Sequence, residues 1–385
     1  MARTWPVTRR KRVLLSAFDA VARPFASLLH RDRVDAGNRD VKRILVLELW
    51  HMGDVVLATP VLQRLREIYP AATITLLAKA HAAELLEGSG LVDDIVTYDF
   101  PWTATSAKYN PARYDGRAIS ELVKDLRAKR FDLSLDCRMD LRSNVLTRSI
   151  GARRRIGYDF GGGGFLLTDA LPPPPAEQHK VDDWMALLEP LKQDHRIPGV
   201  PTPEPHLSVS AVEREEARQL LESYGIAPDD LVVGIHPGGS HDTKRWSADN
   251  FAEVARSLAS RHDARLVAFV DPEGFGADMQ LGGDAVFVRT SIREMMGLFT
   301  FCDLVLCNDS GPMHAAAALG IPVVAVFRTG SPAAYGPRGV NHAVVGRGAH
   351  WGETSTVPLE DVMTAADSSL SLIRERRHAR AEHGT

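Results

Sequence analysis

Residues 306–327 read Leu-Cys-Asn-Asp-Ser-Gly-Pro-Met-His-Ala-Ala-Ala-Ala-Leu-Gly-Ile-Pro-Val-Val-Ala-Val-Phe, and this stretch decides the fold. An apolar strand ends in a polar turn from Asn308 to Pro312, a helix of small residues follows at once, and a second apolar strand comes next. In an open α/β sheet such a turn lies at the carboxyl end of a strand, where free backbone N–H groups and the helix dipole favour an anionic ligand. The stretch therefore predicts a site for a phosphate-bearing small molecule.

Short apolar runs alternate with helical patterning along most of the chain, which is typical of parallel sheets. The runs that predict strands are 43–49, 73–78, 94–98 and 131–136 and, after a pause, 231–235, 265–270, 285–288, 303–307 and 322–327. The pause lies between His195 and His206, where the sequence is rich in proline, and it predicts a linker between domains. The pattern predicts an α/β fold of two Rossmann-like domains that face one another across a cleft.

The predicted linker divides the chain into five segments. They are a basic arm at 1–41, an N-terminal Rossmann-like domain at 42–194, the proline-rich linker at 195–206, a C-terminal Rossmann-like domain at 207–356, and a C-terminal helix and tail at 357–385. A chain of 385 residues with 44% hydrophobic and 25% charged residues is long enough for two domains with separate cores.

The composition argues against several classes of protein. A net charge of -3 is not that of a dedicated nucleic-acid-binding protein, which usually has a strongly basic surface. The cysteines at 137, 302 and 307 are too few and too scattered for a disulfide framework or a zinc site. No run approaches the ~20 apolar residues that cross a bilayer, and no secretory signal is recognisable. We therefore expect a cytoplasmic protein.

The arm differs from the rest of the chain. Its basic run from Arg9 to Arg12 precedes apolar residues with helical spacing at positions 14, 18, 21, 25 and 28. Pro24 should kink or end this helix. A basic amphipathic helix of this kind either lies on an anionic membrane surface or packs on its own domain or on a partner, and the sequence leaves these alternatives open.

Within the first domain, the strand at 43–49 leads to Trp50-His-Met-Gly-Asp54, and Thr59-Pro60 predicts the N-cap and first residue of a helix through Tyr69. Gly53 and Asp54 are then expected in a loop at the carboxyl end of the strand. A carboxylate there is placed to accept a proton from an attacking hydroxyl. The alternative is a turn aspartate whose carboxylate binds nearby backbone amides. His51 is a second candidate.

In the second domain, the strand at 231–235 runs into the glycine-rich turn His236-Pro-Gly-Gly-Ser240, and Thr243-Lys-Arg-Trp246 follows before a helix. Glycines let the backbone approach a phosphate closely. Lys244 and Arg245 supply positive charge for a diphosphate leaving group, and Ser240 and Thr243 supply hydroxyl donors. The spacing matches neither the Walker loop nor the dinucleotide-binding glycine fingerprint, so the kinase and dehydrogenase classes lose their main support.

Three blocks of sequence resemble, in order and spacing, the bacterial heptosyltransferase family, glycosyltransferase family nine. The blocks are Gly53-Asp54, His236-Pro-Gly with Lys244-Arg-Trp246, and Asn308-Asp-Ser-Gly-Pro-Met-His314. The resemblance runs from about Lys42 to about Val345. It implies a GT-B fold in which the N-terminal domain binds the acceptor, the C-terminal domain binds a nucleotide sugar, and a C-terminal helix crosses back to the first domain.

The resemblance also implies roles for individual residues. Asp54 is expected to be the catalytic base and Lys244 to contact the diphosphate. Further donor contacts are expected at Ser240, Thr243, Glu273, Met296, Asp309, Ser310, Gly311, Pro312 and His314.

Several of these expectations are more specific. Asp309 is expected at sugar hydroxyls or in helix capping, the amides of Ser310 and Gly311 at the phosphates, and Glu273 at the ribose. Met296 either lines the base pocket or fills the core. We expect no required metal ion or other cofactor, because a base and a stabilised diphosphate suffice for an inverting displacement.

The acceptor is the open part of the prediction. Arg138, Arg142, Arg148 and the run 153–155 either meet an anionic lipid-linked saccharide or form a solvated helix face. The resemblance implies an inverting glycosyltransferase that moves a heptose from ADP-heptose to a lipopolysaccharide core or related surface glycan at the cytoplasmic face of the inner membrane. The alternatives are a transferase of the same fold with another nucleotide sugar, a nucleotide-sugar epimerase or hydrolase, and a catalytically inactive nucleotide-sugar-binding protein.

Overall fold

A computed structural model of the chain describes residues 41–104, 110, 114–160, 162–175, 177–192, 202–339, 341–346 and 354–383. The chain divides into two compact units, Met1–Pro203 and Glu204–Thr385, and the division falls within the range 195–206 given to the linker. The predicted amphipathic arm, most of the linker and parts of the loop from Phe100 to Asp115 lie outside the described residues.

Unit 1 is built on a six-stranded sheet in the order β3-β2-β1-β4-β5-β6, in which all neighbouring strands run parallel. The strands are β1 (Arg43–Glu48), β2 (Thr73–Ala78), β3 (Asp94–Thr97), β4 (Leu133–Asp136), β5 (Arg154–Tyr158) and β6 (Asp169–Leu171). The central strands are buried on both faces, as expected for a parallel sheet covered by helices.

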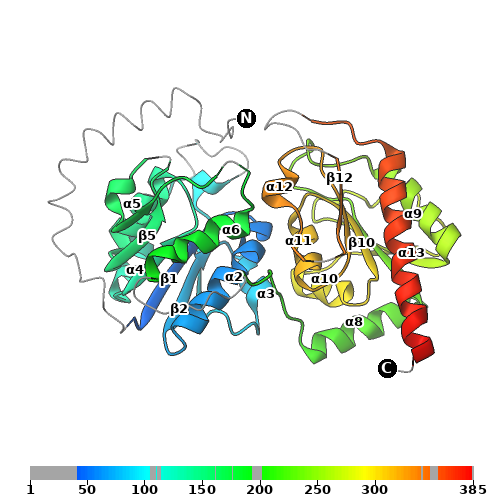
Figure 1. Ribbon diagram of the computed structural model, residues 1–385, viewed down its shortest axis with the longest axis horizontal. Coiled ribbons are helices and arrows are strands. Elements are labelled where there is room, and N and C mark those ends of the chain that lie inside the picture. The colour runs from blue at the N-terminus through cyan, green and yellow to red at the C-terminus, as the bar shows by residue number, and fades with distance from the viewer. Residues whose placement is uncertain are drawn as a thin grey trace. The chain divides into compact units, whose positions relative to one another are not determined.

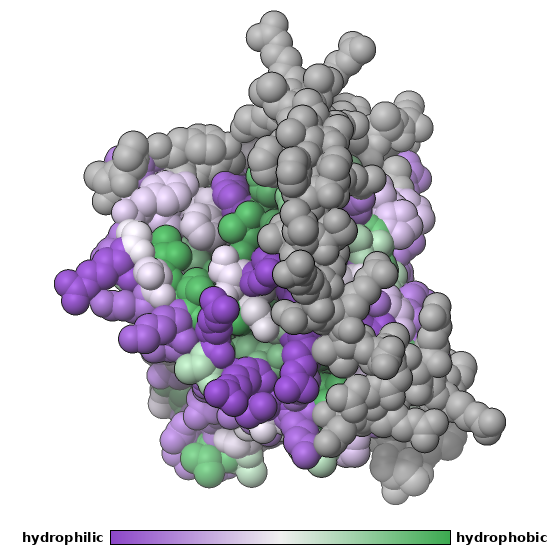
Figure 2. Space-filling view, turned by 90° about the vertical axis from the view of Figure 1, so that its left-hand side faces the viewer, coloured by the Kyte–Doolittle hydropathy of each residue, from purple (hydrophilic) through white to green (hydrophobic). Residues whose placement is uncertain are grey.

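The helices of unit 1 are α2 (Met52–Ile68), α3 (His81–Leu86), α4 (Gly116–Ala128), α5 (Leu141–Ile150), α6 (Lys180–Met185) and α7 (Glu189–Lys192). Helices α2 and α6 pack side by side (Figure 1). Helix α4 buries only Leu126, so most of its residues face solvent. Hydrophilic residues accordingly predominate among the described residues on the side of unit 1 that carries α4 and α5 (Figure 2).

The start of α2 differs from the prediction, which placed it at Thr59-Pro60. The helix begins at Met52, and Pro60 lies inside it. Proline lacks the N–H that would bond the carbonyl of Val56 four residues earlier. The hydroxyl of Thr59 donates to that carbonyl at 2.7 Å instead. The Thr59 hydroxyl therefore satisfies the carbonyl that Pro60 cannot bond, and the Thr-Pro pair lies inside the helix and does not begin it.

Unit 2 repeats this architecture with a parallel sheet in the order β12-β11-β10-β7-β8-β9. The strands are β7 (Leu231–His236), β8 (Ala264–Phe269), β9 (Val286–Val288), β10 (Leu304–Asn308), β11 (Val323–Val326) and β12 (Ala343–Val345). Every strand predicted from the apolar runs is present, with ends shifted by a residue or two. The sequence did not predict β5, β6 and β12, of which β6 and β12 form sheet edges.

The helices of unit 2 are α8 (Ala211–Ser223), α9 (Ala248–His262), α10 (Ile292–Phe299), α11 (Gly311–Ala318), α12 (Pro332–Tyr335) and α13 (Leu359–His383). None of the described helices in either unit is both long and apolar enough to cross a membrane.

Helix α13 runs alongside α9 and completes the core of unit 2 (Figure 1). Its residues Val362, Ala366 and Leu370 are fully buried in one hydrophobic cluster with side chains of β10 and β11. The ring of His262 on α9 lies 2.9 Å from the carboxylate of Asp367. Helix α13 therefore packs on α9 and on the sheet of unit 2, and the crossing back to the first domain that the resemblance implied stays a prediction.

Candidate active site

The strand order gives both units the same topological feature. The winding of each sheet reverses between two neighbouring strands, β1 and β4 in unit 1 and β7 and β10 in unit 2. Connections after such strands diverge to opposite faces of the sheet, and open α/β sheets bind ligands at that point. Most of the residues predicted from the sequence follow β1, β7 or β10, while Glu273 follows β8 and Met296 lies on α10.

Asp54 lies in the first turn of α2, which corrects its predicted place in a loop. Its Oδ2 accepts the N–H of His51 at 3.2 Å, and its own N–H donates to the carbonyl of His51 at 3.0 Å. The backbone contact that the sequence allowed as an alternative is therefore present. The carboxylate is still partly exposed, and the positive end of the helix dipole favours its ionised form. An ionised, partly exposed carboxylate is suited to accept a proton.

Buried charged groups lie next to Asp54, at the carboxyl ends of β1 and β4. We define the Glu48 cluster as Glu48, Trp50, Asp136 and Arg138, whose three charged members are at most 5% exposed. Glu48 Oε1 accepts the N–H of Trp50 at 3.1 Å. The guanidinium carbon of Arg138 lies 3.6 Å from the centroid of the Trp50 ring, a cation–π contact. The backbone N–H of Arg138 donates to Asp136 Oδ1 at 2.8 Å.

The surroundings shift the pKa values of this region. Burial, reinforced by the charge of Asp54, raises the pKa of Glu48 to about 8. Burial raises the pKa of Asp136 to about 7. Burial, and then the charge of Lys79, lowers the pKa of His81 to about 4, so this imidazole is neutral at pH 7. The region next to Asp54 therefore holds fewer charges at neutral pH than its residue types suggest.

Most of the arginines predicted to meet an acceptor have partners within unit 1. Arg138 is buried in the Glu48 cluster, so it lies neither on a solvated helix face nor at an open surface. Arg142 and Arg154 form ion pairs with aspartates at 3.3 and 2.9 Å. Arg155 is buried and donates to backbone carbonyls. These contacts explain the charges locally and assign none of them to an acceptor.

In unit 2, Lys244 and Asp309 form an ion pair at the start of α11. The Nζ of Lys244 lies 2.8 Å from Asp309 Oδ2, and Asp309 is buried. Asp309 was expected at sugar hydroxyls or in helix capping; its carboxylate binds the lysine, Ser310 takes the N-cap position, and the contact with sugar hydroxyls stays a prediction. Ser310 is the N-cap residue of α11 and Gly311 opens the helix, so the first backbone N–H groups have no intrahelical acceptor. The positive charge of Lys244 and the positive end of the α11 helix dipole therefore both lie at the start of α11.

The hydroxyl oxygen of Ser310 is buried and has no hydrogen-bond partner in the part of the chain that the structure describes. An unsatisfied buried hydroxyl of this kind costs about 1 to 3 kcal/mol. Such a group in a native structure calls for an explanation, and a ligand oxygen at the start of α11 supplies one.

Asn308 connects the two sequence blocks that lie in unit 2, and sequence reasoning did not give it a role. Its fully buried side chain accepts the N–H of Trp246 at 3.0 Å and donates to the carbonyls of Pro237 and Gly238 at 2.6 and 3.3 Å. One amide thus fixes the glycine-rich turn and the Lys-Arg-Trp loop to the end of β10. The sequence signal that could have revealed this role is a polar residue at the end of a continuously apolar strand.

The remaining predicted donor contacts lie in different surroundings. Ser240 and Thr243 are exposed in the loop after β7. Pro312 is partly exposed in the first turn of α11, and His314 is buried one turn further on. Met296 is fully buried, so of its two predicted roles the structure supports filling the core. Among the described residues, no group of three His, Cys, Asp or Glu side chains is arranged to hold a metal ion.

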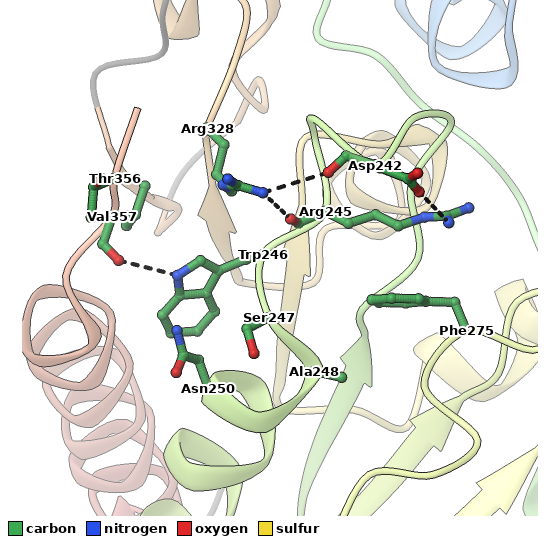
Figure 3. Close-up of a pocket in the computed structure, with 10 residues that line it drawn as sticks. All are labelled: Asp242, Arg245, Trp246, Ser247, Ala248, Asn250, Phe275, Arg328, Thr356 and Val357. Atoms are coloured by element: carbon green, nitrogen blue, oxygen red, sulfur yellow. Dashed lines mark hydrogen bonds and ion pairs between the residues drawn. The ribbon is translucent and has the colours of Figure 1, made fainter. Parts of the chain in front are cut away.

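A pocket of about 580 Å³ opens at the start of α9, beside the Lys-Arg-Trp loop (Figure 3). Arg245 contributes to its wall whereas Lys244 does not, and Arg245 pairs with Glu273 at 2.8 Å. The two basic residues predicted to serve one diphosphate therefore have separate surroundings, and Glu273 binds a side chain. The lining residues are Asp242, Arg245, Trp246, Ser247, Ala248, Asn250, Phe275, Arg328, Thr356 and Val357.

Hydrogen bonds to backbone carbonyls fix the walls of this pocket. Trp246 Nε1 donates to the carbonyl of Val357 at 3.1 Å, and Arg328 donates to the carbonyls of Asp242 and Arg245 (Figure 3). The Lys-Arg-Trp loop is thereby held from two sides, by Asn308 and by these contacts. Lys244 is consequently carried on a well-anchored loop.

Comparison with known proteins finds a family model and several relatives that are described as heptosyltransferases. A family model described as glycosyltransferase family 9 (heptosyltransferase) matches residues 119–362. Lipopolysaccharide core heptosyltransferase OpsX of Haemophilus influenzae is 25% identical over 304 residues, covering 76% of this chain and 80% of that protein. Lipopolysaccharide heptosyltransferase 2 of Escherichia coli is 25% identical over 311 residues, covering 75% and 84%.

Solved structures show the same fold. The glycosyl transferase family 9 structure from Veillonella parvula matches with a TM-score of 0.69 at 22% identity, covering 88% of this chain and 99% of that one. The E. coli ADP-heptose lps heptosyltransferase II matches with a TM-score of 0.67 at 22% identity, covering 86% and 99%. The predicted GT-B fold with its two Rossmann-like domains is thus confirmed.

Proposed function

The chain belongs to glycosyltransferase family 9, the heptosyltransferase family, and from this premise we propose that it transfers a heptose from ADP-heptose to a lipopolysaccharide core or a related surface glycan. The reaction class follows from the family, and the chain is a glycosyltransferase. The proposed donor and acceptor rest on the names of similar proteins, which include an ADP-heptose lps heptosyltransferase and a lipopolysaccharide core heptosyltransferase.

The ion pair of Lys244 and Asp309 at the start of α11 is the observation that carries this proposal. A nucleotide sugar reacts by losing a nucleoside diphosphate, so its site needs positive charge where the diphosphate oxygens lie. The Lys244 ammonium, the first N–H groups of α11 and the buried hydroxyl of Ser310 are the groups that such an anion requires. Asp309 keeps the lysine in place beside them.

We assign the role of base to Asp54. In an inverting transfer the acceptor hydroxyl attacks the anomeric carbon of the sugar, and its proton passes to the Asp54 carboxylate. The bond from the anomeric carbon to the diphosphate oxygen breaks at the same time, and ADP leaves with the bonding electrons. Lys244 and the α11 amides stabilise the charge that develops on ADP. Because these residues supply both the base and the positive charge, we propose that no metal ion is required.

The roles of the two residues can be separated by experiment. We expect Asp54→Asn to lower kcat at least about a hundredfold and to leave the affinity for ADP-heptose within about twofold. Lys244→Ala should weaken donor affinity at least about tenfold and lower kcat as well, because it removes a charge-assisted contact to the diphosphate. Affinity is measured by calorimetry, and transfer by labelled heptose incorporation into heptose-free lipopolysaccharide. Asp125→Asn and Lys124→Ala, both exposed on α4, are matched controls.

The same assays test the alternatives. Equal loss of donor binding in the Asp54 and Lys244 variants would contradict the assigned roles. Preference for a UDP- or GDP-linked sugar would replace the proposed donor. Turnover of the nucleotide sugar without acceptor would indicate an epimerase or hydrolase. Donor binding without turnover on any acceptor, unaffected by Asp54→Asn, would indicate a binding protein that has lost catalysis.

We propose further that the arm at 1–41 brings the enzyme to the cytoplasmic face of the inner membrane. The arm lies outside the described residues apart from its last residue, so the proposal rests on its sequence. A basic run followed by apolar residues at helical spacing is typical of helices that lie on anionic lipid surfaces. A lipid-linked acceptor would be reached from such a surface.

A further inference from the structure

We propose that Glu48 is a positioning residue for Asp54, and that it acts as a neutral, protonated carboxyl buried behind the turn from β1 to α2. The catalytic part of this inference rests on the proposed role of Asp54 as the base. The structural part concerns the protonation state of Glu48 and stands independently of catalysis.

A continuous set of contacts leads from Glu48 to Asp54. Glu48 Oε1 accepts the N–H of Trp50, which fixes the turn after β1. The indole of Trp50 lies under the Arg138 guanidinium on one side and meets the ring of His51 edge-on, with centroids 6.2 Å apart. The N–H of His51 then binds the Asp54 carboxylate at 3.2 Å. A change at Glu48 is therefore transmitted to the place where the base begins α2.

The charges around Glu48 come from two elements. The carboxylate of Asp54 faces it from α2, and Asp136 and Arg138 face it from the end of β4 and the residues that follow. Arg138 is the single cation among them, and its Nη2 also lies 3.4 Å from Asp140. The thiol of Cys137 lies in the same surroundings, and burial raises its pKa well above the ordinary value, so it stays neutral. Among the described residues, two acidic side chains, Asp54 and Asp136, and one cation, Arg138, thus act on Glu48.

The second carboxyl oxygen of Glu48 supports the neutral form. Oε2 is buried and has no hydrogen-bond partner among the described residues, and Glu48 as a whole is 1% exposed. An ionised carboxylate with an unpaired, dehydrated oxygen is costly, whereas a neutral carboxyl is much less so. The pKa of about 8 for Glu48 agrees with this geometry. Glu48 therefore carries its proton at neutral pH.

A neutral Glu48 has a consequence for the base. Asp54 is then free of a second negative charge behind its turn, and it can remain ionised in a fixed position. When Glu48 ionises, the two carboxylates repel one another and their titrations become coupled. The turn that both residues share is strained as a result. We therefore expect sugar transfer to fall at least about twofold as the pH rises through 8.

The protonation state is tested without any enzyme assay. In the full chain labelled with ¹³C at glutamate carboxyls, the Glu48 resonance is identified by its absence in Glu48→Gln. We expect it to titrate with a midpoint near pH 8, and the midpoint to fall by about one unit or more in Asp54→Asn, because the charge of Asp54 helps to raise it. A midpoint near the ordinary value of 4.5, or no response to Asp54→Asn, overturns the proposal.

The positioning role is tested by the pH profile of heptose transfer. Glu48→Gln keeps the acceptor for the Trp50 N–H and cannot ionise, so its kcat should lie within about twofold of wild type at pH 6.5 and show no fall near pH 8. Glu48→Ala loses that acceptor, so its kcat should fall about tenfold at every pH with the donor KM unchanged. Glu87→Gln, exposed after α3, is the control.

The possible results lead to different conclusions. If Glu48→Gln is as impaired as Glu48→Ala at pH 6.5, the ionised carboxylate is needed and the proposal is wrong. Parallel pH profiles for wild type and Glu48→Gln also overturn it. If wild type itself shows no transfer, the proposed function fails, while the carboxyl titration still decides the state of Glu48.

Discussion

Replacing Asn308 tests how the proposed donor site of unit 2 is held together. Its buried amide makes three hydrogen bonds, to the N–H of Trp246 and to the carbonyls of Pro237 and Gly238. Asn308→Ala leaves three buried polar groups without a hydrogen-bond partner, and each such group costs about 1 to 3 kcal/mol of stability. The cost for the Gly238 carbonyl should be at the low end of this range, because its hydrogen bond is long, at 3.3 Å. We expect unit 2 to lose about 3 to 5 kcal/mol of unfolding free energy. The affinity for ADP-heptose should fall at least about tenfold, because the loop that carries Lys244 loses its anchor.

The measurement combines urea-dependent hydrogen exchange of peptides from β7 and β10 with calorimetry, since two units need not unfold in one transition. Asn308→Asp adds a sharper comparison. It keeps the acceptor for Trp246 but turns an oxygen toward two carbonyls, so it should be at least as destabilising as Asn308→Ala. Gln219→Ala, exposed on α8 of the same unit, is the matched control and should change stability by less than about 0.5 kcal/mol. A loss below about 1 kcal/mol in Asn308→Ala, or normal donor affinity in Asn308→Asp, would refute the reasoning.

Two further predictions concern unit 1 and the arm. Burial and the charge of Asp54 raise the folded pKa of Glu48 from 4.5 to about 8, so the stability gained from the proton is complete below pH 4.5 and is lost as the pH rises to about 8. The difference between the two pKa values corresponds to about 5 kcal/mol of unfolding free energy at about 1.36 kcal/mol per pH unit. In urea unfolding, Glu48→Gln should therefore lose less stability than wild type between pH 5 and pH 9. Identical losses would contradict the raised pKa of Glu48. Deletion of residues 1–40 should leave the far-ultraviolet circular dichroism of the folded units unchanged and reduce co-sedimentation with anionic liposomes. Undiminished co-sedimentation would argue against the arm as the membrane contact.

The fold was predictable because a parallel sheet buries both faces of its central strands. Runs such as 304–307 therefore stand out as continuous apolar segments. The missed strands lack this signal. β5 begins with two arginines, and β6 and β12 are three-residue strands at sheet edges. Their pairing depends on a neighbouring strand that is distant in sequence, which local patterns do not record.

The candidate site was predictable in part. Motif blocks located Asp54, Lys244 and Asp309 because each follows a recognisable strand. The pairing of Lys244 with Asp309 joins residues that are 65 positions apart, and the bonds of Asn308 reach back 62 to 71 positions, so no local pattern reveals them. Arg138 was misplaced for a related reason. A charged residue is expected at the surface, and its burial against Trp50 depends on the end of a neighbouring strand.

The packing of α13 affects how the protein is made on the ribosome. The strands of unit 1 all lie within the first part of the chain, so its sheet can form while unit 2 is still being synthesised. Unit 2 cannot close its core in the same way. Helix α9 covers β7 and β8 on the face that also carries α13, but the part of this face over β10 and β11 stays uncovered until Val362, Ala366 and Leu370 have left the exit tunnel. The nascent chain therefore exposes an apolar sheet face for longer in unit 2 than in unit 1, and a chaperone that binds extended apolar segments would meet it there.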